Sequence, residues 1–169
     1  HVRAGQKRGH GVGLTRKGTG TRLMLHTDGT GVPIGMLVAS AQQAEVRLAE
    51  ATLATMQVPG RRGRPRTRPQ RLVCDHAYDS RRWRRQLRRC GSGCCIPARR
   101  LPPHTTRKRR GRPVGYQRAV YARRYIVERS FAWLLATRRI VVRWERRLEV
   151  YRGCVLLAMA MMCLKRLVQ

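Results

Sequence analysis

The stretch Arg71-Leu-Val-Cys-Asp75-His-Ala-Tyr-Asp79-Ser80 decides the fold. Its apolar residues, 72–74, predict a short buried strand, and that strand ends in the carboxylate of Asp75. A turn over residues 76–80 and an arginine-rich helix to about residue 89 follow it. A strand, an acid, a turn and a helix in this order predict an α/β protein with acids at the ends of its strands.

Upstream of this stretch, the sequence predicts a hairpin and a helix. The β-compatible runs 23–27 and 32–39 flank Asp28-Gly-Thr-Gly, which is typical of a tight turn and makes Asp28 a turn residue. Residues 43–57 place apolar side chains at helical spacing and are followed by Pro59-Gly60. The glycine-rich, basic residues 1–21 show no period, so no element is expected there.

Downstream, the pattern alternates again between strands and helices. We expect a strand at 94–97, a helix at 117–137 that carries Glu128, a strand at 140–144 and a final helix at 148–167. The apolar run 154–164 is too short to cross a bilayer, so it predicts a buried helix and no membrane partner. We therefore expect a single α/β domain over 1–169, with basic loops at 60–70 and 98–115.

The charge predicts a polyanionic partner. Lysine and arginine number 38 against eight acids, which gives a net charge of +30. Arginine binds phosphate through two parallel hydrogen bonds, and such a field attracts DNA or RNA. A GC-rich genome also enriches arginine, so the charge indicates binding and not chemistry. The basic loops contain no aromatic residues for stacking on bases, so we expect them to contact phosphates.

The six cysteines show no regular framework, which predicts free thiols in a reducing cytosol. A zinc cluster of Cys90, Cys94, Cys95 and His104 is the alternative, but its spacing matches no common zinc-binding motif.

Two of the eight acids stand in contexts that suggest catalysis. Asp75 ends a strand, and Glu128 lies in a helix with an apolar stripe. Carboxylates from separate elements that meet in a basic cleft suit Mg²⁺, a hard cation that prefers oxygen ligands. Spacing alone supports a structural interpretation equally: Asp75 would cap the next helix, and Glu128 would pair with Arg124 at i, i+4.

Two segments carry a resemblance to a known family. The segment Val73-Cys-Asp75-His-Ala-Tyr-Asp79-Ser80 resembles the second-aspartate motif of bacterial insertion-sequence transposases of the DDE class. Residues 121–131, with Tyr121, Arg124 and Glu128 in order, resemble the third motif, the Tyr-Arg-Glu signature. The similarity continues through Arg138-Arg139 and the closing helix, so it covers essentially the whole chain.

The resemblance implies a ribonuclease H-like mixed sheet with flanking helices. It implies that Asp75 and Glu128 are two of three acids that hold two Mg²⁺ or Mn²⁺ ions. These ions would support cleavage of DNA at the ends of the element and transfer of the freed 3′ hydroxyl to target DNA. We expect a cytoplasmic, nucleoid-associated protein that forms a homodimer or higher oligomer on DNA. The expected DNA contacts are Tyr121, Arg124, Arg138, Arg139, Arg107, Lys108, Arg109 and Arg110.

The chain departs from the family pattern at two places. The family often carries a basic residue seven positions after the glutamate; here that position is Leu135, so we expect Arg138 or Arg139 to replace it. The first aspartate of the family usually precedes a His-Val-Arg context, and this chain starts at His1-Val2-Arg3. We therefore expect the first acid and its central strand to lie outside this sequence, and this fragment alone to have weak activity or none. Asp28 matches the family's non-catalytic hairpin turn.

Two further classes compete with an active transposase. A truncated, inactive remnant would still bind nucleic acid through its arginines. A basic ribosomal or RNA-chaperone protein would fit the charge but would leave the two acid motifs unexplained.

Overall fold

The computed structural model describes residues 2–4, 9–16, 18–60, 62–99 and 116–168. These residues form a mixed α/β structure, as expected, and they divide into two compact units. The first unit comprises His1–Thr67 and Tyr125–Gln169, and the second comprises Arg68–Arg124.

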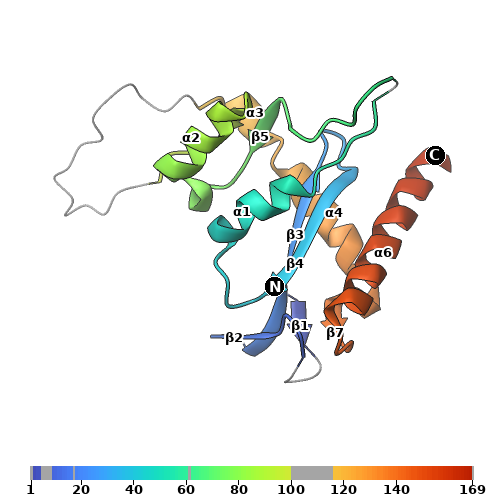
Figure 1. The fold of residues 1–169 in the computed structure, drawn as a ribbon. Helices are drawn as coiled ribbons and strands as arrows, with labels where there is room; N and C mark the ends of the chain where they lie inside the picture. Colours follow the sequence, from blue (N-terminus) through green and yellow to red (C-terminus); the bar gives the residue numbers. More distant parts are fainter. Residues whose placement is uncertain (1, 5–8, 17, 61, 100–115, 169) are drawn as a thin grey trace. The chain divides into compact units, whose positions relative to one another are not determined.

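The first unit is built on a five-stranded mixed sheet (Figure 1). The long strand β3 pairs antiparallel with β1, β2 and β4, and β1 pairs parallel with β7. These strands are β1 (Val2–Ala4), β2 (Gly13–Thr15), β3 (Gly18–Thr27), β4 (Pro33–Ser40) and β7 (Val142–Arg143).

The predicted hairpin is confirmed as β3 and β4, and its turn is held by one carboxylate oxygen. Asp28 Oδ1 accepts hydrogen bonds from the backbone N–H groups of Thr30, Gly31 and Val32, each at 2.8 Å. Partial burial would raise the pKa of Asp28, but a hydrogen bond from the Thr30 hydroxyl and those from the backbone outweigh it and hold the pKa below its usual value. Gly31 adopts a φ of 95°, which favours glycine. Asp28 is therefore a turn residue, as the sequence predicts.

The core of the first unit lies between the hairpin and two helices. Leu23 and Leu25 of β3 pair with Val38 and Met36 of β4, and all four are buried. They pack against α4 (Tyr125–Leu135) and α6 (Leu148–Val168), which contribute the fully buried Leu134, Tyr151 and Val155.

The helix α1 (Glu45–Ala54) covers the other face of the hairpin. Gly35 neighbours Met36, so a side chain there would point to the opposite face. A Cβ atom on Gly35 would lie 2.8 Å from Thr55 Oγ1 and 3.2 Å from Met56 N, directly after α1. Helices therefore flank both faces of the hairpin.

The second unit contains the stretch from Arg71 to Ser80, which includes Asp75 and Asp79. The strands β5 (Arg71–Val73) and β6 (Gly93–Cys95) pair in parallel, with Leu72 opposite Cys94. The remaining elements are η1 (His76–Tyr78), α2 (Arg81–Arg89) and α3 (Arg118–Ala122). Ser80 caps α2, because its Oγ accepts from Trp83 N at 3.1 Å. Trp83, Leu87 and Ile96 are buried in this unit.

Three expectations about elements were wrong in detail. The glycine-rich segment contains the short strands β1 and β2. The helix expected at 117–137 is broken at residues 123–124 into α3 and α4. Ile140 and Val141, expected in a strand, end the short helix α5 (Arg138–Val141) instead, and only Val142–Arg143 is extended. Within the described ranges, no helix is long and apolar enough to cross a membrane.

Candidate functional site

Asp75 lies two residues after the end of β5, close to where the sequence placed it. It caps η1, because its Oδ1 accepts from the backbone N–H of His76 at 2.6 Å. The same oxygen lies 2.6 Å from His76 Nδ1. The side chain of Asp75 is nevertheless 39% exposed, so the carboxylate remains accessible to a ligand. The structural and the catalytic interpretations are thus compatible for this residue.

Tyr121 brings the two sequence motifs together within the second unit. Its phenol lies near enough to the carboxylate of Asp75, 46 positions earlier in the chain, to interact with it electrostatically. The guanidinium of Arg124 lies 5.8 Å from the centroid of the Tyr121 ring. Desolvation raises the pKa of Tyr121 and the Asp75 charge raises it further, while Arg124 opposes the shift. An acid, a phenol and a guanidinium therefore form one connected group.

Asp79, the other acid of this stretch, has a structural environment. Its Oδ1 accepts from Arg84 Nε at 2.8 Å, and its Oδ2 accepts from Arg99 N at 2.7 Å. The side chain of Asp79 is only 3% exposed. A buried carboxylate that is already paired is poorly placed to bind a ligand.

The other predicted residues differ in what the structure places around them. Glu128 lies in the first turn of α4, in the first unit, and is exposed. Arg138 and Arg139 begin α5; Arg139 Nε donates to Glu145 Oε1 at 2.8 Å. Arg107, Lys108, Arg109 and Arg110 lie outside the described residues, as does most of the basic loop at 98–115.

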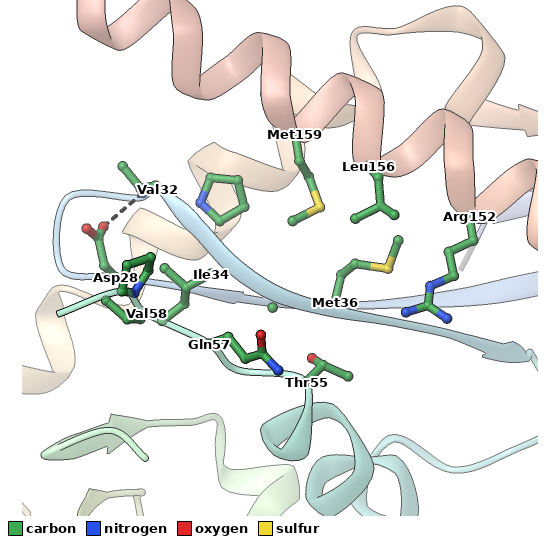
Figure 2. A pocket seen from close by; sticks show the side chains of 13 residues that line it. Asp28, Val32, Ile34, Met36, Thr55, Gln57, Val58, Arg152, Leu156 and Met159 are labelled. Carbon is green, nitrogen blue, oxygen red and sulfur yellow. Dashed lines mark hydrogen bonds between the residues drawn. The ribbon is translucent and has the colours of Figure 1, made fainter. Parts of the chain in front are cut away.

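A cavity of about 460 Å³ lies in the first unit beside β4, α6 and the segment after α1 (Figure 2). Its walls are mostly apolar, with Met36, Leu156 and Met159 among them. Asp28 is the acid that lines it, and the turn occupies one oxygen of that carboxylate with several hydrogen bonds. The cavity therefore has no pair of acids, and its mostly apolar lining differs from the polar group around Asp75.

Comparison with known proteins decides the family. The family model of the transposase DDE domain matches residues 1–163. The chain belongs to the transposase DDE domain family. It is also 31% identical over 145 residues to the "Putative transposase for insertion sequence element IS402" of Burkholderia cepacia. That match covers 85% of this chain and 63% of its relative, so the chain spans less than two thirds of the relative's length. No solved structure matches the chain significantly.

DDE transposases typically use divalent metal ions, so the donors of this transposase domain can be compared with what such ions need. Asp75 and Glu128 are exposed carboxylates, and carboxylate oxygens are the donors that Mg²⁺ and Mn²⁺ prefer. Among the described residues, no group of three or more histidine, cysteine or acidic side chains is close enough to hold a metal. The chemistry of the two donors fits a divalent cation.

An aromatic and cationic row on α4 was not predicted from the sequence. Tyr125, Arg129 and Trp133 follow one another at i, i+4 and i+8, a spacing that places side chains on one helical face. This spacing was the signal in the sequence that would have identified the row.

Proposed function

We propose that this chain belongs to the catalytic domain of an insertion-sequence transposase. The enzyme cleaves DNA at the ends of its element and joins the freed 3′ hydroxyl to target DNA. Asp75 and Glu128 would be two of the three acids that hold two Mg²⁺ or Mn²⁺ ions. Bound ions would activate the attacking oxygen and stabilise the leaving oxygen.

The observation that carries this proposal is the contact between Tyr121 and Asp75. The second-aspartate motif and the Tyr-Arg-Glu motif are separate in the sequence, and the interacting side chains of Asp75 and Tyr121 bring them together. The phenol lies near the carboxylate, and Arg124 next to the ring adds a positive charge where a DNA phosphate would approach. A protein that only coated DNA would gain nothing from holding an exposed acid in place.

The proposed fold is ribonuclease H-like, with the whole chain in a single domain. The mixed sheet, the antiparallel β3–β4 hairpin and the parallel β5–β6 pair are compatible with it. The proposed partner is DNA, and the net charge of +30 supports this. We also propose that the transposase assembles on DNA as a homodimer or higher oligomer, in association with the nucleoid.

An inactive remnant is the second candidate, and the charge alone favours it. Arginines bind phosphates without any metal or acid, so such a protein would bind DNA and leave it intact. Removal of the Asp75 or Glu128 carboxylate would then leave DNA affinity unchanged, and the DNA would stay intact with or without these acids.

The two candidates separate in a cleavage assay with the full-length gene product. The substrate is a duplex that carries the DNA ends flanking the gene, incubated with Mg²⁺ or Mn²⁺. We expect metal-dependent nicking that falls by about a hundredfold or more in Asp75→Asn and Glu128→Gln, while DNA affinity stays within about twofold. Glu149→Gln, an exposed acid in the first turn of α6, is the matched control and should cleave normally. Tight binding without cleavage by the wild-type protein would favour the remnant.

A further inference from the structure

Four side chains of the first unit form a row of alternating rings and guanidinium groups. The Cζ atom of Arg129 lies 5.8 Å from the ring centroid of Tyr125 and 5.4 Å from that of Trp133. The Cζ atom of Arg166, near the end of α6, lies 5.1 Å from the Trp133 centroid. We call these four residues, Tyr125, Arg129, Trp133 and Arg166, the α4 ladder.

The rings of the ladder are open to solvent. Tyr125 is 56% exposed and Trp133 is 47% exposed. The chain has only nine aromatic residues, three Trp, five Tyr and one Phe. Burial of rings normally contributes to stability, so two large exposed rings on one helical face suggest a ligand that covers them.

The two guanidinium groups are fixed by the β3–β4 turn. Arg129 Nη2 donates to the backbone oxygen of Thr30 at 3.1 Å, and Arg166 Nη1 donates to Thr30 Oγ1 at 3.4 Å. Neither arginine takes part in an ion pair found among the described residues. Each therefore keeps its positive charge and further N–H donors in a fixed position, which reduces the entropy cost of binding an anion.

A purely structural role for the ladder does not explain why its two rings are exposed. The turn is already held by Asp28 Oδ1 and by Ser130 Oγ, which donates to Gly31 O at 2.8 Å in a buried position. Two exposed rings are not needed to fix that turn. They are useful if flat, π-rich groups lie against them.

We propose that the α4 ladder binds unpaired nucleotides of a DNA strand. Bases stack on the rings of Tyr125 and Trp133, and the flanking phosphates bind Arg129 and Arg166. In a duplex the faces of the bases are covered by their neighbours, so the rings select nucleotides that are not stacked within a helix. The inference rests on the proposed function only in taking DNA as the partner.

The test compares a single strand with a duplex on the full-length protein. The probes are a fluorescein-labelled oligothymidylate of about 12 nucleotides, within the usual size range of such sites, and a duplex of equal length. We expect Trp133→Ala and Tyr125→Ala each to weaken single-strand binding by about tenfold and duplex binding by less than about twofold. Trp133→Phe should restore most of the loss. Trp144→Ala, which removes a 62% exposed tryptophan outside the ladder, should leave both affinities unchanged.

A second measurement avoids any effect of truncation on folding. In a Trp144→Phe background, Trp133 is the exposed tryptophan that remains, because Trp83 is 5% exposed. Stacking of a base on Trp133 quenches its fluorescence, so the single strand should quench it and the duplex should not.

Each outcome bears on one proposal. The ladder is not a site for unpaired nucleotides if the alanine variants lose equal affinity for both probes, or if they lose no affinity for the single strand. The absence of Trp133 fluorescence quenching by the single strand would overturn it as well. A wild-type protein that binds the duplex but not the single strand would do the same and leave the proposed function intact. If the wild-type protein binds neither probe, DNA binding itself, and with it the proposed function, is refuted.

Discussion

Asp79 and Arg84 form a buried ion pair in the second unit, with 2.8 Å between Oδ1 and Nε. Their side chains are 3% and 6% exposed. Arg84 also donates to Ile96 O at 2.6 Å, so the pair connects the turn before α2 to the end of β6. Two aspartates four residues apart thus differ in environment: Asp75 is accessible and Asp79 is enclosed.

We expect Asp79→Ala to lower the free energy of unfolding of the second unit by about 3 kcal/mol, because it leaves a buried guanidinium without its partner. Asp75→Asn should cost less than about 1 kcal/mol, because its carboxylate is partly exposed and screened. Urea unfolding followed by Trp83 fluorescence, with Trp133 and Trp144 replaced by Phe, measures both. A larger loss in Asp75→Asn than in Asp79→Ala would contradict this assignment.

Arg143 is a second buried cation, and its role is to fix the first unit. It is 1% exposed, and its Cζ lies 5.4 Å from the Tyr151 ring centroid. Its guanidinium donates to four oxygens: Thr21 Oγ1, His10 O, Glu145 O and Arg146 O. Burial lowers the pKa of Arg143, but the group remains a donor to all four.

We expect Arg143→Lys to destabilise the first unit by about 2 kcal/mol or more, because a single ammonium cannot reach acceptors arranged around a planar fork. The exposed Arg147→Lys is the control and should stay within about 0.5 kcal/mol of the wild type. Thermal unfolding compares the three proteins. Equal melting temperatures would show that the four contacts do not stabilise the fold.

The buried imidazole of His26 makes the first unit sensitive to acid. Burial lowers the pKa of His26 to about 4, and its Nε2 has no hydrogen-bond partner among the described residues. An unfolded histidine titrates at about pH 6.5. Between these two values the unfolded chain binds a proton that the folded chain does not, so stability falls as the pH falls from about 6.5 to about 4.

The expected loss of unfolding free energy over this pH window is at most about 3 kcal/mol. His26→Leu should remove it, whereas His76→Gln, at an exposed position, should retain it. Urea unfolding at several pH values measures the difference between each variant and the wild type. If His26→Leu keeps the full acid dependence, another group is responsible.

Arg138 and Arg139 should contribute unequally to DNA binding. The charge of Arg139 is partly neutralised by Glu145, at 2.8 Å. Arg138→Gln should therefore reduce the slope of log affinity against log salt by about one, and Arg139→Gln should reduce it by less. Fluorescence anisotropy over a salt series on a duplex gives both slopes. Equal reductions would mean that Glu145 releases Arg139 when DNA binds.

The sequence predicted the elements whose signals are local. The β3–β4 hairpin, α1, the β5–Asp75–α2 segment and α6 were all expected close to where they lie. The strands β1 and β2 were not, because a glycine-rich segment has no period of its own and becomes extended by pairing with β3. The run at 140–144 contains β-branched residues, yet its start is helical because Ile140 packs into the core from the single turn of α5.

The candidate site was predictable residue by residue, but its contacts were not. The position of Asp75 at a strand end follows from the pattern of residues 71–75. Its interaction with Tyr121 spans 46 positions, and no local rule predicts that two such distant side chains come together. The environment of Asp79 depends equally on distant groups: Arg99 N donates to its Oδ2, and Ile96 O accepts from its partner Arg84.

The central claim, that Asp75 and Glu128 hold the same catalytic metal ions, is tested most directly by counting bound Mn²⁺. Electron paramagnetic resonance of the full-length protein on its end duplex gives the number of bound ions per chain. The account predicts that Asp75→Asn and Glu128→Gln each remove the same ions and that the double variant removes no more. Mn²⁺ binding that survives both substitutions, or losses that add independently, would contradict it.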